Sequence, residues 1–208
     1  MIMINEFLDY LDELIPNPRC ELNYNKDYEL LLAVMLSAQT TDKRVNEVTS
    51  VLFKKYNSIS SLASADINDI MNIIKPIGTF KKKASNVILI AKSLIENNYN
   101  YIPNNREYLE SLPGVGKKTT NVVLSILYNE PCIAVDTHVS RVSKRLKLAS
   151  INDDVLTIEK KLMKKLPNDK LNKLHHQILL FGRYYCKARN PECINCKMSK
   201  YCREFKKK

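Results

Sequence analysis

Residues 112–119 read Leu-Pro-Gly-Val-Gly-Lys-Lys-Thr, and this stretch predicts a tight turn that leads directly into a helix. Gly114 and Gly116 can adopt positive φ angles and allow another backbone to approach closely. The following helix begins with free amide groups and the positive end of its dipole, so the turn can bind a phosphate. Ordinary corners between helices use the same residue types, so the turn alone does not establish phosphate binding.

Lys117 and Lys118 fall in the first turn of the helix predicted for residues 117–128. Positive charges are disfavoured at a helix N-terminus, and neighbouring ammonium groups disfavour each other. Both effects favour the neutral amine, which is the nucleophilic form of lysine. The pair therefore predicts phosphate binding or covalent catalysis, although a solvated basic helix start has the same sequence.

Outward from this turn, apolar residues recur with helical spacing along most of the 208-residue chain. Alternating strand patterns are weak, and the chain has only 4 glycines, which argues against a fold rich in hairpins. The sequence predicts an all-α fold of nine or ten helices, at about residues 4–15, 28–38, 42–56, 66–75, 82–96, 108–112, 117–128, 137–148, 154–166 and 170–185.

The chain carries 33 Lys and Arg against 22 Asp and Glu, a net charge of +11. Such an excess favours a polyanionic partner, either nucleic acid or a membrane surface, although it can also serve solubility. Residues 1–15 contain no basic residue, so they resemble neither a secretory signal nor a mitochondrial presequence. No window is apolar enough for a membrane span. We therefore expect a cytoplasmic protein without a membrane partner.

A carboxylate follows the apolar run Ile133-Ala134-Val135, at the start of another predicted helix. Asp136 is well placed to cap that helix. A capping carboxylate is also held in a fixed orientation, so it could stabilise a cation in a cleft. His138 is expected to be a hydrogen-bonded structural residue or a phosphate contact.

The C-terminal segment contains four cysteines with the spacing C-x6-C-x2-C-x5-C, namely Cys186, Cys193, Cys196 and Cys202. Thiols stay reduced in the cytoplasm, so clustered cysteines indicate a metal site before disulfides. Four thiolates in a short loop can hold zinc or an iron–sulfur cluster, and the spacing alone does not decide between them. Cys20 and Cys132 lie elsewhere and are expected to be small buried hydrophobic residues.

Four segments together resemble the endonuclease III family of helix-hairpin-helix DNA glycosylases and AP lyases. They are LPGVGKKT at 112–119, AVDTH at 134–138, LSAQTTD at 36–42 and the cysteine pattern, and the similarity covers nearly the whole chain. The resemblance implies a two-domain, all-α fold with a C-terminal four-cysteine iron–sulfur loop at 186–202. One domain, a six-helix barrel at 22–131, would contain the helix-hairpin-helix at about 108–128. Residues 1–21 and 132–208 would form the other.

The resemblance also implies roles for individual residues. Lys118 would be the nucleophile, Asp136 would assist it, and the four cysteines would hold a [4Fe–4S] cluster. Gln39 would fill the gap left by a flipped base. Thr79 stands where relatives carry a bulky apolar wedge, so Phe80 or Ile77 could serve instead. The implied DNA contacts are Gln39, Thr79, Gly114, Val115, Gly116, Lys117, Thr119, His138, Arg183 and Lys187.

The implied function is base excision repair by a monomer that acts on damaged double-stranded DNA near the nucleoid. The enzyme would remove oxidised pyrimidines and cut the strand 3′ to the abasic site by β-elimination through a lysine Schiff base. The alternatives are a monofunctional glycosylase, a non-catalytic DNA-binding module and a zinc-containing adaptor. Adenine-excising relatives lack a lysine at the position of Lys118, which argues against that specificity.

Overall fold

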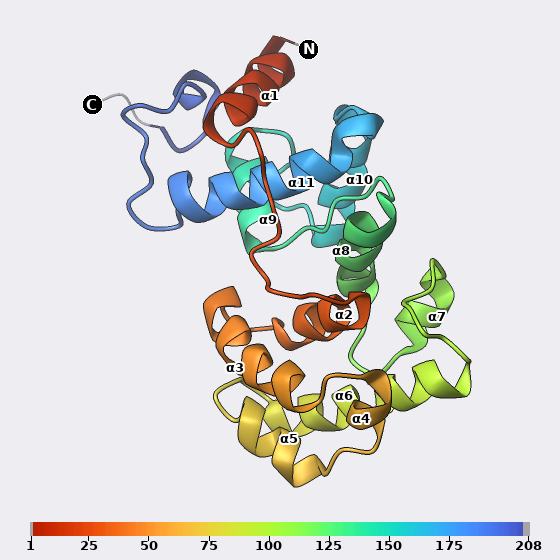
Figure 1. The fold of residues 1–208 in the computed structure, drawn as a ribbon. Coiled ribbons are helices and arrows are strands. Elements are labelled where there is room, and N and C mark those ends of the chain that lie inside the picture. Colours follow the sequence, from red (N-terminus) through yellow and green to blue (C-terminus); the bar gives the residue numbers. More distant parts are fainter. Residues whose placement is uncertain (1, 206–208) are drawn as a thin grey trace. The chain divides into compact units, whose positions relative to one another are not determined.

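The computed structural model describes residues 2–205, and within this range the secondary structure is entirely helical (Figure 1). The predicted all-α fold is thereby confirmed. The α-helices are α1 (Ile2–Leu14), α2 (Asp27–Leu36), α3 (Asp42–Lys55), α4 (Ile59–Ala63), α5 (Ile67–Ile74), α6 (Phe80–Glu96), α7 (Arg106–Ser111), α8 (Lys117–Tyr128), α9 (Thr137–Arg145), α10 (Val155–Lys165) and α11 (Leu171–Leu180). Three single turns complete the set: η1 (Asn168–Lys170), η2 (Phe181–Tyr185) and η3 (Ser199–Tyr201).

The chain divides into two compact units. The hairpin unit is the contiguous segment Cys20–Tyr128, which contains α2 to α8. The cysteine unit combines the residues up to Arg19 with those from Asn129 onward, so helix α1 joins α9, α10 and α11. Each unit has a hydrophobic core of its own.

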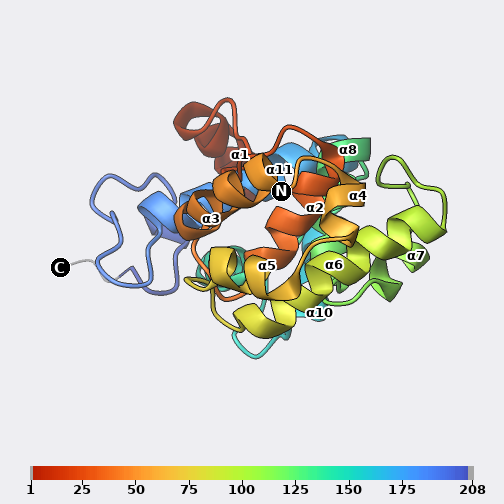
Figure 2. The ribbon, with the colours of Figure 1, turned by 60° about the horizontal axis from the view of Figure 1, so that its bottom comes forward.

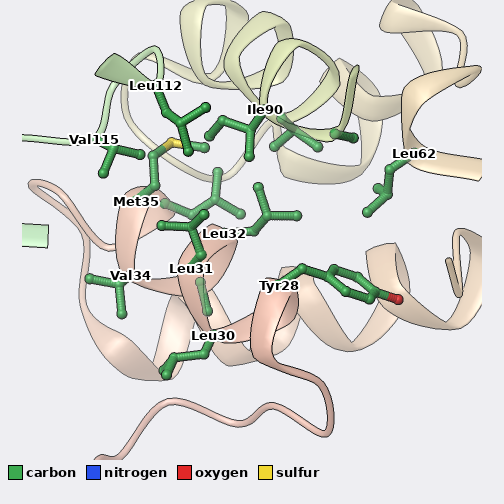
Figure 3. Close-up of a cluster of buried hydrophobic side chains, with 14 of the residues drawn as sticks. Tyr28, Leu30, Leu31, Leu32, Val34, Met35, Leu62, Ile90, Leu112 and Val115 are labelled. Carbon is green, nitrogen blue, oxygen red and sulfur yellow. The ribbon is translucent and has the colours of Figure 1, made fainter. Parts of the chain in front are cut away.

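Helix α2 is the centre of the hairpin unit. From Tyr28 to Leu36 every residue is buried, because the sequence offers almost no polar face. The helix packs against α3, α6 and α8, and Figure 2 shows the neighbouring helices of this unit gathered around it. Figure 3 shows Leu112, Val115 and Ile90 close to the end of α2 that carries Met35. The core therefore reaches directly to the turn at residues 112–116.

Two differences from the predicted helices in this unit have local causes. Helix α2 ends at Leu36 instead of Ala38, because Gln39 adopts a left-handed conformation with φ of 57°. Helix α4 was not predicted, since five residues are too few for a periodic pattern. Ser58 caps α4 by accepting a hydrogen bond of 3.1 Å from the Ser61 amide.

The core of the cysteine unit joins the two ends of the chain. Phe7 and Tyr10 of α1 both pack edge-to-face against Phe181, with ring centroids 5.9 Å apart in each pair. Ion pairs from Lys197 to Glu13 and from Lys200 to Glu6 add contacts between α1 and the C-terminal loop. The N-terminal helix is thus an integral part of the unit that carries the cysteines.

Helix boundaries in the cysteine unit also differ from the prediction. Helix α9 ends at Arg145 instead of Leu148, since Lys147 adopts a left-handed φ of 60°. The predicted helix 170–185 is α11 followed by the π-helical turn η2.

Of the two isolated cysteines, Cys132 is buried as expected, whereas Cys20 is only half-buried. Within residues 2–205 no helix is both long and apolar enough to cross a membrane.

Replacing Phe7 with alanine should lower the free energy of unfolding by about 3–5 kcal/mol, because its buried ring leaves a cavity between α1 and η2. Chemical denaturation would measure the change. The control Ile151→Ala, at a side chain that is 63% exposed, should stay within about 0.5 kcal/mol of the unchanged protein. A loss below about 1 kcal/mol for Phe7→Ala would contradict this packing.

Candidate functional site

Helices α7 and α8 are joined by the turn at residues 112–116, which is anchored to the core at both ends. Leu112 and Val115 are each 4% exposed, and the Val115 amide donates to the Leu112 carbonyl at 3.1 Å. Gly114, which lies between these two residues, and Gly116, which follows Val115, are both exposed. The turn therefore has a fixed backbone and an open outer surface, which leads into the N-terminus of α8.

Gly114 is required at its position for two independent reasons. Its φ of +80° is a conformation that L side chains rarely adopt. In addition, a Cβ placed there would lie 2.3 Å from Nδ2 of the buried Asn86 on α6. Gly116 has nothing within 4 Å of an added Cβ and is not at positive φ. Of the two turn glycines, only Gly114 needs the conformational freedom that the sequence offered.

Lys117 and Lys118 are the first two residues of α8, as predicted, and both are exposed. Successive residues of a helix point about 100° apart, so the two ammonium groups leave the helix in different directions. Thr119 is half-buried behind them. A phosphate-binding lysine and a nucleophilic lysine can therefore be adjacent in sequence and still act separately.

Two further turns of the hairpin unit present the residues expected near the lesion. Gln39 follows α2 and Thr79 precedes α6, and both are exposed residues in the left-handed conformation, with φ of 57° and 56°. The Thr79 hydroxyl donates to the Gly78 carbonyl at 2.6 Å. Ile77 is only 1% exposed and Phe80 is half-buried against the core. The idea that Ile77 could act as a wedge is therefore wrong.

Asp136 is the N-cap of α9, and its Oδ1 accepts a hydrogen bond of 2.8 Å from the Val139 amide. The preceding residues from Cys132 to Val135 are buried, so the carboxylate is held on a rigid support. The predicted cap is confirmed. Because the side chain is only half-buried, its second oxygen can still take part in chemistry.

Helix α9 packs tightly against η2, the turn that leads into the cysteine segment. A Cβ at Gly182 would lie 2.9 Å from the Cβ of His138. Arg141 donates to the Gly182 carbonyl at 2.6 Å and to the Cys186 carbonyl at 3.0 Å, and it also contacts Nδ1 of His138 at 3.1 Å. His138 is thus a structural partner of Arg141, as one of its two predicted roles required.

Arg145 holds the start of the cysteine segment one turn further along α9. Its guanidinium donates to the Lys187 carbonyl at 2.7 Å and to the Cys186 sulfur at 3.5 Å. The Lys187 ammonium is paired with Glu192 at 3.0 Å, and Arg183 is half-buried. Arg141 and Arg145 together fix where this segment leaves the helical core.

The four cysteines of the motif are all half-buried in a segment of tight turns. Burial raises the pKa of the Cys196 thiol, and the charges of Cys186, Cys193 and Cys202 raise it further. Burial likewise raises the pKa of Cys186, against the opposing effect of Arg145. No set of three or more His, Cys, Asp or Glu side chains within residues 2–205 is arranged as a metal site.

Sequence reasoning missed the supporting residues of these segments, namely Lys83, Asn86, Arg141 and Arg145. Val87 lies four positions after Lys83, and Ile90 lies four positions after Asn86. Because both Val87 and Ile90 are buried, Lys83 and Asn86 share the apolar face of α6. Polar residues on an otherwise apolar helix face could have identified these two positions from the sequence. The two arginines of α9 carried no comparable signal, because their partners are backbone carbonyls distant in sequence.

Comparison with known proteins identifies the family. The model of the HhH-GPD superfamily of base excision DNA repair proteins matches residues 32–168. Endonuclease III of Bacillus subtilis is 43% identical over 201 residues, which is 97% of this chain and 92% of that protein. The chain belongs to the endonuclease III family. Endonuclease III of Haemophilus influenzae is 45% identical and covers 98% of the chain and 95% of its own length.

A solved structure of a trapped endonuclease III–DNA covalent intermediate has a TM-score of 0.92 and 42% identity. The match covers 97% of this chain and 95% of that one. Membership of the endonuclease III family confirms the predicted helix-hairpin-helix fold and the predicted enzyme class. This family member is a DNA glycosylase with AP lyase activity in base excision repair. The alternatives of a non-catalytic module and a zinc adaptor are thereby superseded.

Gly114→Ala should destabilise the hairpin unit by about 1–3 kcal/mol, because both the backbone conformation and the contact with Asn86 oppose a Cβ. Thermal and chemical unfolding would measure the loss. Gly116→Ala should have a much smaller effect, since the space around it is open. If removing the Asn86 side chain as well does not restore part of the loss, the contact is not the cause.

Proposed function

We propose that Lys118 is the nucleophile of this enzyme and that Asp136 assists it. The observation that carries the proposal is the position of Lys118, exposed in the first turn of α8 directly after the rigid hairpin turn. The similar endonuclease III structure described above is a trapped covalent intermediate with DNA, so a nucleophile is required in the family. Asp136 supplies a carboxylate whose orientation is fixed by its capping hydrogen bond.

Damaged double-stranded DNA is the partner. The N-terminal amides of α8 and the backbone of Gly114, Val115 and Gly116 would bind a phosphate, because these amides lack helical partners and lie at the positive end of the dipole. The Val115 side chain is buried, so its contribution is limited to the backbone. Further contacts are proposed for Lys117, Thr119, Thr79, His138, Arg183 and Lys187.

The damaged nucleotide must leave the base stack before the chemistry can begin, at a cost of a few kcal/mol. Gln39 lies at an exposed turn with its amide available, so it can occupy the gap and bond to the unpaired base opposite. Thr79 is small and polar, so position 79 carries no bulky wedge, and the half-buried Phe80 is the alternative in the same turn. Oxidised pyrimidines stack weakly, and we propose them as the preferred substrates.

The chemical steps begin with attack by the Lys118 amine. Its lone pair forms a bond to C1′, while the C1′–N bond breaks and its electrons leave with the base, which takes up a proton. Asp136 stabilises the cationic sugar and helps to move protons. The attached nitrogen then loses a proton, and its lone pair forms the C1′=N bond of a protonated Schiff base while the C1′–O4′ bond breaks and O4′ takes up a proton. The Schiff base acidifies the hydrogen on C2′. Loss of that proton expels the phosphate on C3′, so the strand is cut 3′ to the lesion.

The cysteine segment is proposed to hold a [4Fe–4S] cluster. The chemistry of its donor set fits that group, because four half-buried thiols lie within 17 residues of sequence. The ligands would be Cys186, Cys193, Cys196 and Cys202. When bound, the cluster would shape a DNA-contacting loop without taking part in strand cleavage.

We further propose that the enzyme is a monomer and acts on the nucleoid in the cytoplasm.

Borohydride reduction of the Schiff base tests the nucleophile. The unchanged protein, incubated with a duplex that contains thymine glycol or an abasic site, should give a covalent protein–DNA band on denaturing gels. Lys118→Ala should lose this band completely while it still binds DNA. Lys117→Ala should bind more weakly yet still be trapped. Release of the base without any trapping in the unchanged protein would indicate a monofunctional glycosylase instead.

Asp136→Asn separates catalysis from capping, since asparagine caps a helix as well as aspartate does. The variant should keep its unfolding temperature and lose about a hundredfold or more in turnover, because the stabilising negative charge is removed. Single-turnover base release would measure the effect. Unchanged turnover would remove Asp136 from the mechanism.

Cys196→Ser tests the metal site. The purified unchanged protein should show a visible absorption band with iron and sulfide in nearly equal amounts, and Cys196→Ser should lose both. Cys20→Ser is the matched control at a half-buried cysteine outside the motif and should retain the band. Zinc in place of iron would overturn the proposed cofactor, and an intact band in Cys196→Ser would overturn the ligand assignment.

A further inference from the structure

Lys83 is a buried lysine for which the proposed chemistry has no role. Its side chain is 5% exposed, and it belongs to the first turns of α6, where a positive charge is unfavourable. Burying an ammonium group is costly unless hydrogen bonds replace its water. The partners that compensate this cost show what the residue does.

The Lys83 ammonium has three N–H donors. Each donates to an oxygen of the last residue of α2 or of the turn that follows it. Nζ donates to the Leu36 carbonyl at 2.8 Å, to the Ala38 carbonyl at 2.7 Å and to the Thr40 hydroxyl at 3.4 Å. The last carbonyls of a helix lack helical partners and carry the negative end of its dipole. The Lys83 ammonium is therefore disfavoured by the positive N-terminus of α6 but stabilised by the negative C-terminus of α2.

These oxygens lie on both sides of Gln39. The Ala38 carbonyl belongs to the peptide unit that leads into Gln39, and Thr40 follows it in the chain. The turn is closed by the Thr40 amide, which donates to the Ser37 carbonyl at 3.0 Å. A non-glycine residue at φ of 57° is strained and persists where its surroundings hold it. Lys83 supplies that hold from the core side of the turn.

The same face of α6 reaches the other two segments of the site. The Lys83 amide donates to the Thr79 carbonyl at 3.1 Å, at the turn where α6 begins. Asn86, three residues after Lys83, is buried against Gly114 of the hairpin. Residues three apart share a helix face. One face of α6 thus connects the Gln39 turn, the Thr79 turn and the hairpin turn.

We infer that Lys83 is a positioning residue that holds the Gln39 turn in the shape needed for insertion into duplex DNA. This inference rests on the role proposed for Gln39 above. Lys83 is buried, so it acts through the two carbonyls that precede Gln39 and the Thr40 hydroxyl that follows it. A purely structural Lys83 would instead contribute to stability without any specific link to Gln39.

A double-mutant cycle distinguishes these two roles. The variants are Lys83→Met, Gln39→Ala and the double variant, with Lys82→Met as the control, because Lys82 is the exposed neighbour with the same charge. The measurements are kcat/KM for cleavage of a thymine glycol duplex and the fluorescence of 2-aminopurine opposite a tetrahydrofuran abasic analogue at saturating protein. The fluorescence reports insertion opposite the unpaired base without requiring any chemistry.

Lys83→Met should lose about tenfold to a hundredfold in kcat/KM, as expected when an inserting group is displaced by about 1 Å. It should also lose the fluorescence change, as Gln39→Ala does, whereas Lys82→Met should retain both. The double variant should be no worse than the more affected single variant. If the two losses multiply, or if Lys83→Met behaves like Lys82→Met, the inference is overturned.

Thr40→Val provides a second route if Lys83→Met does not fold, because it removes the longest of the three Lys83 hydrogen bonds together with the 3.4 Å bond from the Thr40 hydroxyl to the Ala38 carbonyl. Its smaller loss in kcat/KM should also vanish in a Gln39→Ala background, and an additive loss would overturn the inference. Failure of the proposed function has a different signature. In that case the unchanged protein would cleave no damaged duplex, while the fluorescence arm would still report on Lys83 and Gln39.

Discussion

The complete burial of α2 is the constraint on which the hairpin unit depends. A helix without a polar face must be covered on all sides, and α3, α6 and α8 provide that cover. Covering α2 brings the start of α8 and the start of α6 to its C-terminal end. Met35 there lies beside the hairpin turn, and the Leu36 carbonyl receives Lys83. The hydrophobic effect thus assembles, at one helix end, three turns that are far apart in sequence.

Most of this arrangement could be predicted because its signals are local. The apolar run of α2, the start of α8 at Lys117 and the Asp136 cap each depend on a few adjacent residues, and all three are present in the structure. The family motifs added the expected fold and enzyme class. Helix α4 escaped prediction because a five-residue helix leaves no periodic pattern.

What could not be predicted are the contacts between segments that are distant in sequence. Lys83 turns inward because the end of α2 offers it three oxygens, and no residue near it in the sequence indicates this contact. Likewise, nothing in the sequence near Arg145 indicates that it would donate to the Lys187 carbonyl. Such partners become known only when the packing of the helices is known.

The composition of the cysteine unit from both ends of the chain has a consequence for the order of events during synthesis. The hairpin unit is contiguous, so it can fold as soon as it leaves the ribosome. Helix α1 emerges earlier, but Phe7 and Leu11 remain without the core that covers them until Phe181 has been made. Helix α1 can therefore complete its packing only after η2 has been synthesised. Throughout that interval its apolar face is open to water and to chaperones.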